Sequence, residues 1–182
     1  MDIRLDLTLD KLSIAGLNAG DRVLLSGKLY TARDAAHKRL LGMISEGYDL
    51  PIDSNGETIY YAGPCPARPG RITGSAGPTT SGRMDMYTPA LISKGLLGMI
   101  GKGDRNDLVL EAIRMHGAVY FGATGGAGAL LSAKIVSSEI VAFPDLGTEA
   151  IRRLEVKDFP VIVIIDSRGT DIYRENCAKY RR

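Results

Sequence analysis

Gly77-Pro78-Thr79-Thr80-Ser81-Gly82-Arg83-Met84-Asp85 is the stretch on which the interpretation of this chain depends. Its glycines let the backbone approach a ligand closely, and Pro78 fixes one φ angle. Three consecutive hydroxyl groups precede Arg83, whose planar guanidinium can bind a carboxylate or phosphate with two parallel hydrogen bonds. A helix that follows would add partial positive charge from its N-terminus. The stretch therefore predicts an oxyanion-binding loop, with a polar turn that caps a helix as the alternative.

A second candidate anion contact follows the next apolar run. A helix is predicted over residues 86–94 and a strand over residues 96–100, and Gly101-Lys102-Gly103-Asp104-Arg105 stands at the carboxyl end of that strand. Open α/β sheets place ligand contacts at this end of their strands. Lys102 between two glycines is therefore a candidate anion ligand, and the alternative is an exposed loop lysine.

A third candidate lies nearer the N-terminus. Thr31 is a good N-cap residue for a helix that Gly47 ends, which puts Arg33 in the first helical turn. The helix dipole disfavours a cation there, so Arg33 is a candidate ligand-binding residue. The alternative is an arginine that faces solvent and pairs with Asp34. His37, one turn further on, is interpreted as a surface or core histidine.

The coarse pattern of the chain is that of a layered α/β domain. Strands alternate with helices through the middle of the sequence, which predicts a parallel sheet, and the strand-rich ends predict further antiparallel pairing. The glycine-rich turn over residues 122–128 resembles a dinucleotide-binding loop, but its spacing differs from that pattern, and close helix–sheet packing is the preferred interpretation. Strands are predicted over residues 3–9, 21–30 with a bend or bulge at Gly27, 58–62, 118–121, 139–143, 148–156 and 159–166. The segment 12–20 is predicted as a linking turn, and the tail 175–182 is predicted to fray. Asn106 is predicted to cap a helix that Gly117 ends.

Composition excludes several classes of protein. A length of 182 residues predicts one domain, residues 1–182, and a net charge of +2 does not favour nucleic-acid binding. No apolar run has the length of a membrane span, and the N-terminus lacks the apolar core of a secretory signal, so a cytoplasmic location is predicted. Two cysteines and two histidines are too few for a convincing metal site in this chain.

Five motifs occur in order along the chain: Thr31-Ala32-Arg33-Asp34-Ala35-Ala36-His37, Gly63-Pro64-Cys65-Pro66, the stretch 77–85, Gly101-Lys102-Gly103 and Ala142-Phe143-Pro144-Asp145-Leu146-Gly147. Together they resemble one enzyme family, the beta subunits of iron–sulfur class I fumarate hydratases and L(+)-tartrate dehydratases. The similarity extends over nearly the whole chain. The resemblance implies a swivelling β/β/α domain with a central, mainly parallel sheet, a second sheet and a helical layer.

The same resemblance implies a hydro-lyase that is active only with an alpha subunit. The activity would be reversible hydration of fumarate to (S)-malate, or dehydration of a tartrate. The alpha subunit would carry a four-iron four-sulfur cluster with one iron as Lewis acid, and this chain would bind no cofactor or metal itself. The substrate would be a small dicarboxylate, and the assembly would be a homodimer or hetero-tetramer.

Residue roles also follow from the resemblance. Arg33 and Arg83 match arginines that bind substrate carboxylates, and Lys102 matches a substrate-binding lysine. Thr79 matches the threonine proposed to move the proton at carbon, with Thr80 beside it.

The chemistry of hydration suits these residue types. Fixed cations stabilise the charge that builds up on a carboxylate in the transition state, whereas a threonine hydroxyl is a weak base that needs activation. No residue of this chain clearly activates it, so a composite active site is expected. The remaining alternative is a non-catalytic domain that binds a small anion.

Overall fold

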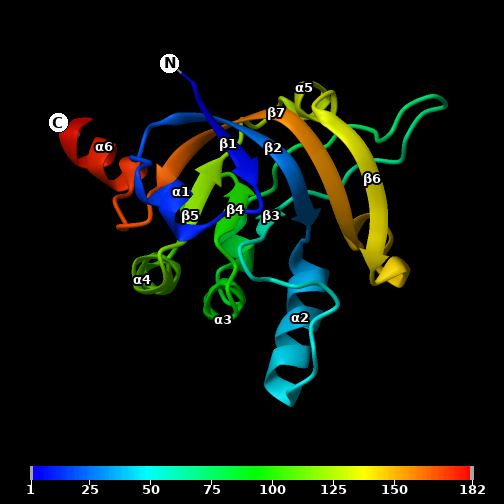
Figure 1. Cartoon of the computed structure of the whole chain (residues 1–182), viewed down its shortest axis with the longest axis horizontal. Helices are drawn as coiled ribbons and strands as arrows, with labels where there is room; N and C mark the ends of the chain where they lie inside the picture. Colours follow the sequence, from blue (N-terminus) through cyan, green and yellow to red (C-terminus); the bar gives the residue numbers. More distant parts are fainter. Residues whose placement is uncertain (1, 181–182) are drawn as a thin grey trace.

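The computed structural model describes residues 2–180, with the side chains of residues 2–176, and combines seven strands with helices (Figure 1). The strands are β1 (Ile3–Leu7), β2 (Arg22–Thr31), β3 (Thr58–Tyr60), β4 (Gly98–Gly101), β5 (Val119–Gly122), β6 (Ile135–Ala142) and β7 (Ile151–Ile165). The α-helices are α1 (Lys11–Ala15), α2 (Asp34–Glu46), α3 (Thr88–Ser93), α4 (Asp107–His116), α5 (Gly128–Ser132) and α6 (Ile172–Tyr180), and two 3₁₀ helices are η1 (Ser81–Met84) and η2 (Pro144–Glu149).

The strands form one mixed sheet that curls onto itself. Strands β1 to β5 are parallel neighbours, in the order β1-β2-β3-β4-β5, and β7 continues the sheet antiparallel to β5. Strand β7 also pairs with β2 along nearly its whole length, and β6 lies on its other edge. Hydrogen bonds therefore run in a closed circuit through β2, β3, β4, β5 and β7.

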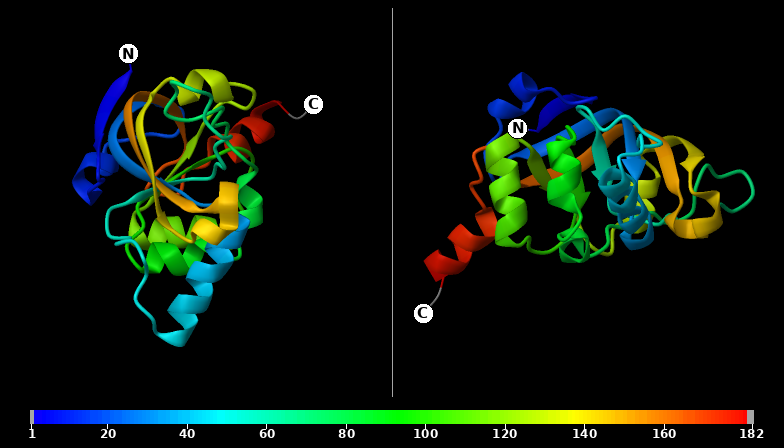
Figure 2. Two further views of the ribbon diagram at one scale, coloured as in Figure 1. Left: turned by 90° about the vertical axis from the view of Figure 1, so that its right-hand side faces the viewer. Right: turned by 90° about the horizontal axis from the view of Figure 1, so that it is seen from below.

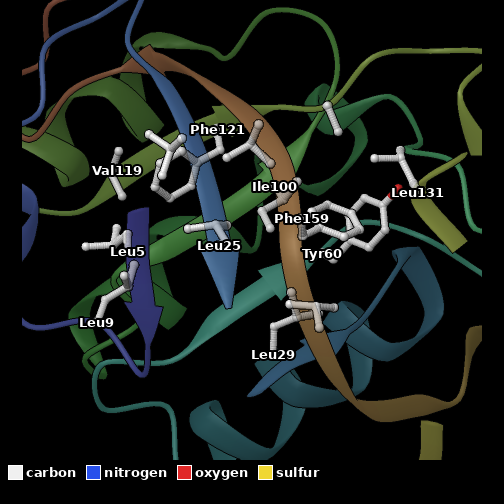
Figure 3. Close-up of a cluster of buried hydrophobic side chains, with 14 of the residues drawn as sticks. Leu5, Leu9, Leu25, Leu29, Tyr60, Ile100, Val119, Phe121, Leu131 and Phe159 are labelled. Carbon is white, nitrogen blue, oxygen red and sulfur yellow. The ribbon is translucent and has the colours of Figure 1, made fainter. Parts of the chain in front are cut away.

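Strands β3, β4 and β5 are buried on both faces, which explains why they are apolar in consecutive positions. Neighbouring residues alternate between two cores, because successive side chains of a strand point to opposite faces. One core lies inside the curled sheet (Figure 3) and the other lies against the helices. The inner core takes Tyr60, Ile100, Phe121 and Val163, and the helix-side core takes their neighbours Ile59, Met99, Tyr120 and Ile164.

Helices α2, α3 and α4 cover one side of the sheet (Figures 1 and 2). Two of them end as predicted, at Gly47 and Gly117 in the left-handed conformation that glycine adopts without strain. Asn106 caps α4 as predicted, since its side chain accepts a hydrogen bond from the amide of Val109 at 3.0 Å. Among the described residues, none of the helices is both long and apolar enough to span a membrane.

The prediction that Thr31 caps the second helix is wrong. Thr31 is the last residue of β2, and its hydroxyl accepts a hydrogen bond from the Arg152 amide at 3.2 Å. Helix α2 begins only at Asp34, and a side chain far along the chain completes its first turn. Glu149 of η2 accepts the hydrogen bond from the Ala35 amide at 2.9 Å, a partner that no local pattern indicates.

Other boundaries also differ from the sequence-based ones. The predicted strands 148–156 and 159–166 are one strand, β7, and the predicted break is a bulge where the register jumps from Leu25–Phe159 to Gly27–Val156. This confirms the bend or bulge expected at Gly27. The predicted helix 86–94 is shorter, since α3 follows the 3₁₀ turn η1, and the turn 12–20 overlaps α1.

The mixed α/β class with a central sheet is confirmed. A separate second sheet is not found among the described residues, because β7 joins β2 and β5 by hydrogen bonds and carries β6 on the same ladder. The tail predicted to fray, residues 175–182, lies partly outside the described residues, and its first part is helical in α6.

Candidate functional site

The candidate residues gather at the carboxyl ends of adjacent parallel strands. Arg33 follows β2, the loop that starts at Tyr61 follows β3, Lys102 follows β4, and the glycine-rich loop 122–128 follows β5. The carboxyl ends of parallel neighbours meet at one edge of a sheet, which is where α/β proteins bind ligands. The topology therefore places these segments at one edge of the sheet.

Main-chain hydrogen bonds attach the 77–85 stretch to that edge. The amide and the hydroxyl of Thr79 lie 2.8 and 2.7 Å from the carbonyl oxygen of Tyr61. The amide of Lys102 donates to the Thr79 carbonyl at 3.3 Å, and the amide of Ser81 donates to the Lys102 carbonyl at 2.9 Å. Thr80 and Lys102 thus form a parallel bridge, and both side chains are exposed. Thr79, Thr80 and Lys102 are brought together.

The hydrogen bond of Thr79 defines what its side chain can do. A carbonyl oxygen only accepts, so the hydroxyl hydrogen points at Tyr61 and the lone pairs of Oγ1 stay available to another donor. Among the described residues, no ionisable side chain forms a hydrogen bond with this hydroxyl. The activation that the threonine needs as a base is therefore not supplied by a contact within the described part of the chain.

Two arginines converge on one carboxylate. Oδ2 of Asp34 lies 3.8 Å from Nη2 of Arg33 and 3.5 Å from Nη2 of Arg83. Glu149 adds a second contact to Arg33, 3.4 Å from Nη2 to Oε1. The pairing of Arg33 with Asp34, foreseen as the alternative to ligand binding, is thus present, but it also joins Arg33 to Arg83.

The backbone leaves room for these cations. A Cβ atom on Gly63 would lie 3.1 Å from Nη1 of Arg33, so glycine lets the guanidinium lie against the chain. A Cβ on Gly125 would lie 3.7 Å from Nζ of Lys102, which puts the glycine-rich loop beside the ammonium group. A Cβ on Gly128 would lie 3.0 Å from the amide nitrogen of Gly77. Close packing beside the site is confirmed for this loop, although the 77–85 stretch, not the sheet, is its partner.

A buried ion pair that sequence reasoning missed lies directly beneath this edge. The side chain of Arg105 is fully buried, and its Nε donates to Oδ1 of Asp85 at 2.6 Å. Its Nη2 donates to the Thr88 hydroxyl at 2.9 Å, and its guanidinium carbon lies 5.3 and 4.9 Å from the ring centres of Tyr61 and Tyr120. Burial opposes the charge, but Tyr61 and Asp85 outweigh it, so the pKa of Arg105 is raised.

His37 lies in the core, one of the two predicted positions. Its Nδ1 is 2.9 Å from the Arg33 carbonyl oxygen, and its Nε2 is buried with no hydrogen-bond partner among the described residues. Burial lowers its pKa to about 4, so the ring is neutral near pH 7. A neutral ring can donate from Nδ1 to Arg33, which ties the start of α2 to the core.

The donor set of this chain does not fit an iron–sulfur cluster. Such a cluster takes about three or four thiolates, and this chain has two cysteines, of which Cys65 is exposed on the loop after β3. In the described part of the chain, histidine, cysteine, aspartate and glutamate form no group of three that could hold a metal ion. The cations and the hydroxyl at this edge are groups that bind anions.

Comparison with known proteins identifies relatives along the whole chain. A family model described as Fumarase C-terminus matches residues 1–176. The chain is 40% identical over 167 residues to the anaerobic class I fumarate hydratase of Escherichia coli K12, and 40% identical over 161 residues to fumarate hydratase 2 of Leishmania major. Each alignment includes 87% of this chain, but only 30% and 28% of those longer proteins.

One relative has a similar length. A Methanocaldococcus jannaschii protein provisionally named L(+)-tartrate dehydratase subunit beta is 39% identical over 173 residues, which are 92% of this chain and 89% of that protein. Segments of this size therefore exist both within long fumarate hydratases and as separate subunits.

Proposed function

This chain belongs to the Fumarase C-terminus family, and from that premise we propose that it is the beta-type component of an iron–sulfur hydro-lyase that interconverts fumarate and (S)-malate. One observation carries the proposal. Arg33 and Arg83 share Asp34, while Lys102 and Thr79 are joined through the main chain at the same strand ends. A dicarboxylate needs such separate cations for its two ends.

The cations match the electronic demand of the reaction. Removal of a proton from the carbon next to a carboxylate sends negative charge onto that carboxylate, so a fixed cation there stabilises the transition state more than the ground state. Arginine is suited to this role because it stays protonated and presents a planar fork of donors. Arg33, Arg83 and Lys102 would bind the substrate carboxylates in this way.

Thr79 would act on the proton at carbon, with Thr80 beside it. Because the Thr79 hydroxyl donates to Tyr61, its free lone pairs can face the substrate, but it must pass on its own proton before it can accept another. An ionisable group of the partner would receive that proton. The active site is thus proposed as composite, and the acid for the leaving hydroxyl also belongs to the partner.

The partner in this proposal is an alpha subunit that carries the four-iron four-sulfur cluster. The chain would act as a single domain, residues 1–182, of the swivelling β/β/α type, in a cytoplasmic homodimer or hetero-tetramer without nucleic-acid or membrane partners. Dehydration of L(+)-tartrate is the second candidate activity, favoured by the similar length of the M. jannaschii relative. A further alternative is a non-catalytic domain that binds a small anion.

Reconstitution tests the proposal. The purified chain alone is expected to leave fumarate unchanged, and addition of the cluster-loaded alpha subunit is expected to produce malate. Parallel assays with L(+)-tartrate decide between the two substrates. Strong turnover by the isolated chain would contradict a composite site. Tight binding of malate or phosphate to the isolated chain in calorimetry, without activity in the complex, would favour the anion-binding alternative.

A further inference from the structure

The ion pair of Arg105 and Asp85 connects the segments that carry Arg83 and Lys102. Asp85 directly follows η1, which contains Arg83, and Arg105 ends the segment that begins with Lys102. The two residues are brought together by the fold, with 2.6 Å between Nε and Oδ1. The second carboxylate oxygen of Asp85, Oδ2, accepts a hydrogen bond from the Asn106 amide at 2.7 Å, so Asp85 also fixes the start of α4.

The aromatic neighbours of Arg105 extend this connection to the catalytic threonine. Tyr61, whose ring lies over the guanidinium, supplies the carbonyl that accepts both hydrogen bonds of Thr79. Tyr120 packs on the guanidinium as well, and its hydroxyl lies 2.9 Å from Ser81 Oγ and 2.9 Å from the carbonyl oxygen of Gly103. The buried arginine therefore contacts Asp85 beside Arg83, Tyr61 whose carbonyl holds Thr79, and Tyr120 whose hydroxyl reaches the loop of Lys102.

The energetics favour positioning over bulk stability. Removing two charges from water is costly, and apolar residues of similar volume often stabilise a core equally well. A guanidinium that is fully buried and bonded to side chains that include Asp85 and Thr88 is instead a rigid connector with fixed donor directions.

We infer that Arg105, held by Asp85, is the positioning residue that fixes Arg83, Thr79 and Lys102 relative to one another. Arg105 itself is sealed below the site and contacts no substrate. Its part in catalysis rests on the proposed function, whereas its part in ordering the two loops does not.

Hydrogen exchange on the whole chain tests the positioning independently of activity. Two variants are compared with the wild type: Arg105→Lys, which keeps the charge but loses the fork, and the double variant Arg105→Met/Asp85→Asn, which removes both charges. The asparagine of the double variant can still accept a hydrogen bond from the Asn106 amide, so no charge is left buried and unpaired. Arg153→Lys, at an exposed pair with Glu139, is the matched control.

Hydrogen-exchange protection is expected to fall at the amides of the candidate site and not elsewhere in the sheet. In both Arg105 variants, protection of the Ser81 and Lys102 amides should fall about tenfold or more, while the Gly20 and Val163 amides, which pair elsewhere in the sheet, change less than about twofold. Unchanged protection at Ser81 and Lys102 would overturn the inference. Equal loss at Gly20 and Val163 in both variants would also overturn it, because the pair would then serve global stability.

Kinetics of the reconstituted complex add a second readout. Both Arg105 variants are expected to assemble normally and to lose about tenfold or more in kcat, with a smaller change in KM. The reason is that misplaced cations stabilise the transition state less well, while ground-state binding changes little. Normal kcat in both variants would overturn the inference. An inactive wild-type complex would refute the proposed function instead, and the exchange experiment would still decide the role of Arg105.

Discussion

Oδ2 of Asp34 lies 3.5 Å from Nη2 of Arg83, and the same oxygen faces Arg33 at 3.8 Å. One carboxylate thus holds two guanidinium groups that would otherwise repel each other. We predict that Asp34→Asn raises KM for the dicarboxylate about three- to tenfold, equivalent to about 1 kcal/mol, with a smaller effect on kcat. Steady-state kinetics of the reconstituted complex measure this, with Asp107→Asn at an exposed pair with Arg174 as control.

The opposite result would be informative about Asp34. If Asp34→Asn lowered KM, the carboxylate would compete with the substrate for the arginines and would not organise them.

Replacement of Thr79 tests the hydroxyl that faces the site. Thr79→Val keeps the shape but removes the oxygen, and we predict a loss of about 100-fold or more in kcat, in the range typical of proton-transfer groups. Thr79→Ser keeps the hydroxyl and its bond to the Tyr61 carbonyl, so it should retain most of the activity. Gel filtration with the alpha subunit checks assembly, and unchanged kcat in Thr79→Val would remove Thr79 from the chemistry.

Lys102 provides a test of carboxylate binding. Lys102→Met keeps the length of the side chain and removes one charge-assisted hydrogen bond, which is worth about 1.5–3 kcal/mol. We therefore expect kcat/KM to fall about 10- to 100-fold in the reconstituted complex. Lys157→Met, at an exposed lysine on β7, is the matched control. Equal effects of the two substitutions would argue for general electrostatic attraction and against a specific contact.

His37 predicts a pH dependence of stability. Burial lowers its pKa from 6.5 to about 4, so between these values the unfolded chain binds a proton that the folded chain does not. Stability from this residue is fully present above pH 6.5 and falls as the pH drops toward 4, by up to about 3 kcal/mol. Urea denaturation of the wild type and of His37→Asn at pH 7 and pH 4.5 measures the difference, which the variant should lack. Parallel losses in both proteins would contradict the assignment.

Local patterns in the sequence predicted what depends on neighbouring residues. Gly47 and Gly117 end helices because their left-handed conformation is a property of glycine itself, and Asn106 caps its helix from one turn away. Lys102 was placed at the carboxyl end of a strand for a similar reason, since strand and loop follow one another along the chain there. Motif resemblance added the names of the candidate ligands.

Long-range partners could not be predicted in this way. Glu149 completes the first turn of α2 from the far end of the chain, and Arg105 meets Asp85 only because β3 and β4 are neighbours. Asp85 closes the 77–85 stretch, and Arg105 closes the stretch 101–105. Charged residues are mostly exposed, and nothing local indicates that these two are buried. The available signal was that Asp85 and Arg105, which have opposite charges, each end a stretch that carries candidate site residues.

The long strand β7 has a consequence for the order of events during synthesis on the ribosome. One edge of β2, residues 22–31, can form its strand hydrogen bonds only after residues 152–162 of β7 have been synthesised. The candidate site residues lie between these two segments in the sequence. Distant pairing of this kind is slow because a long loop must close first. The parallel units between them can assemble as the polypeptide emerges, but the inner core is sealed only at the end. A nascent chain that stops before β7 should therefore depend on chaperones.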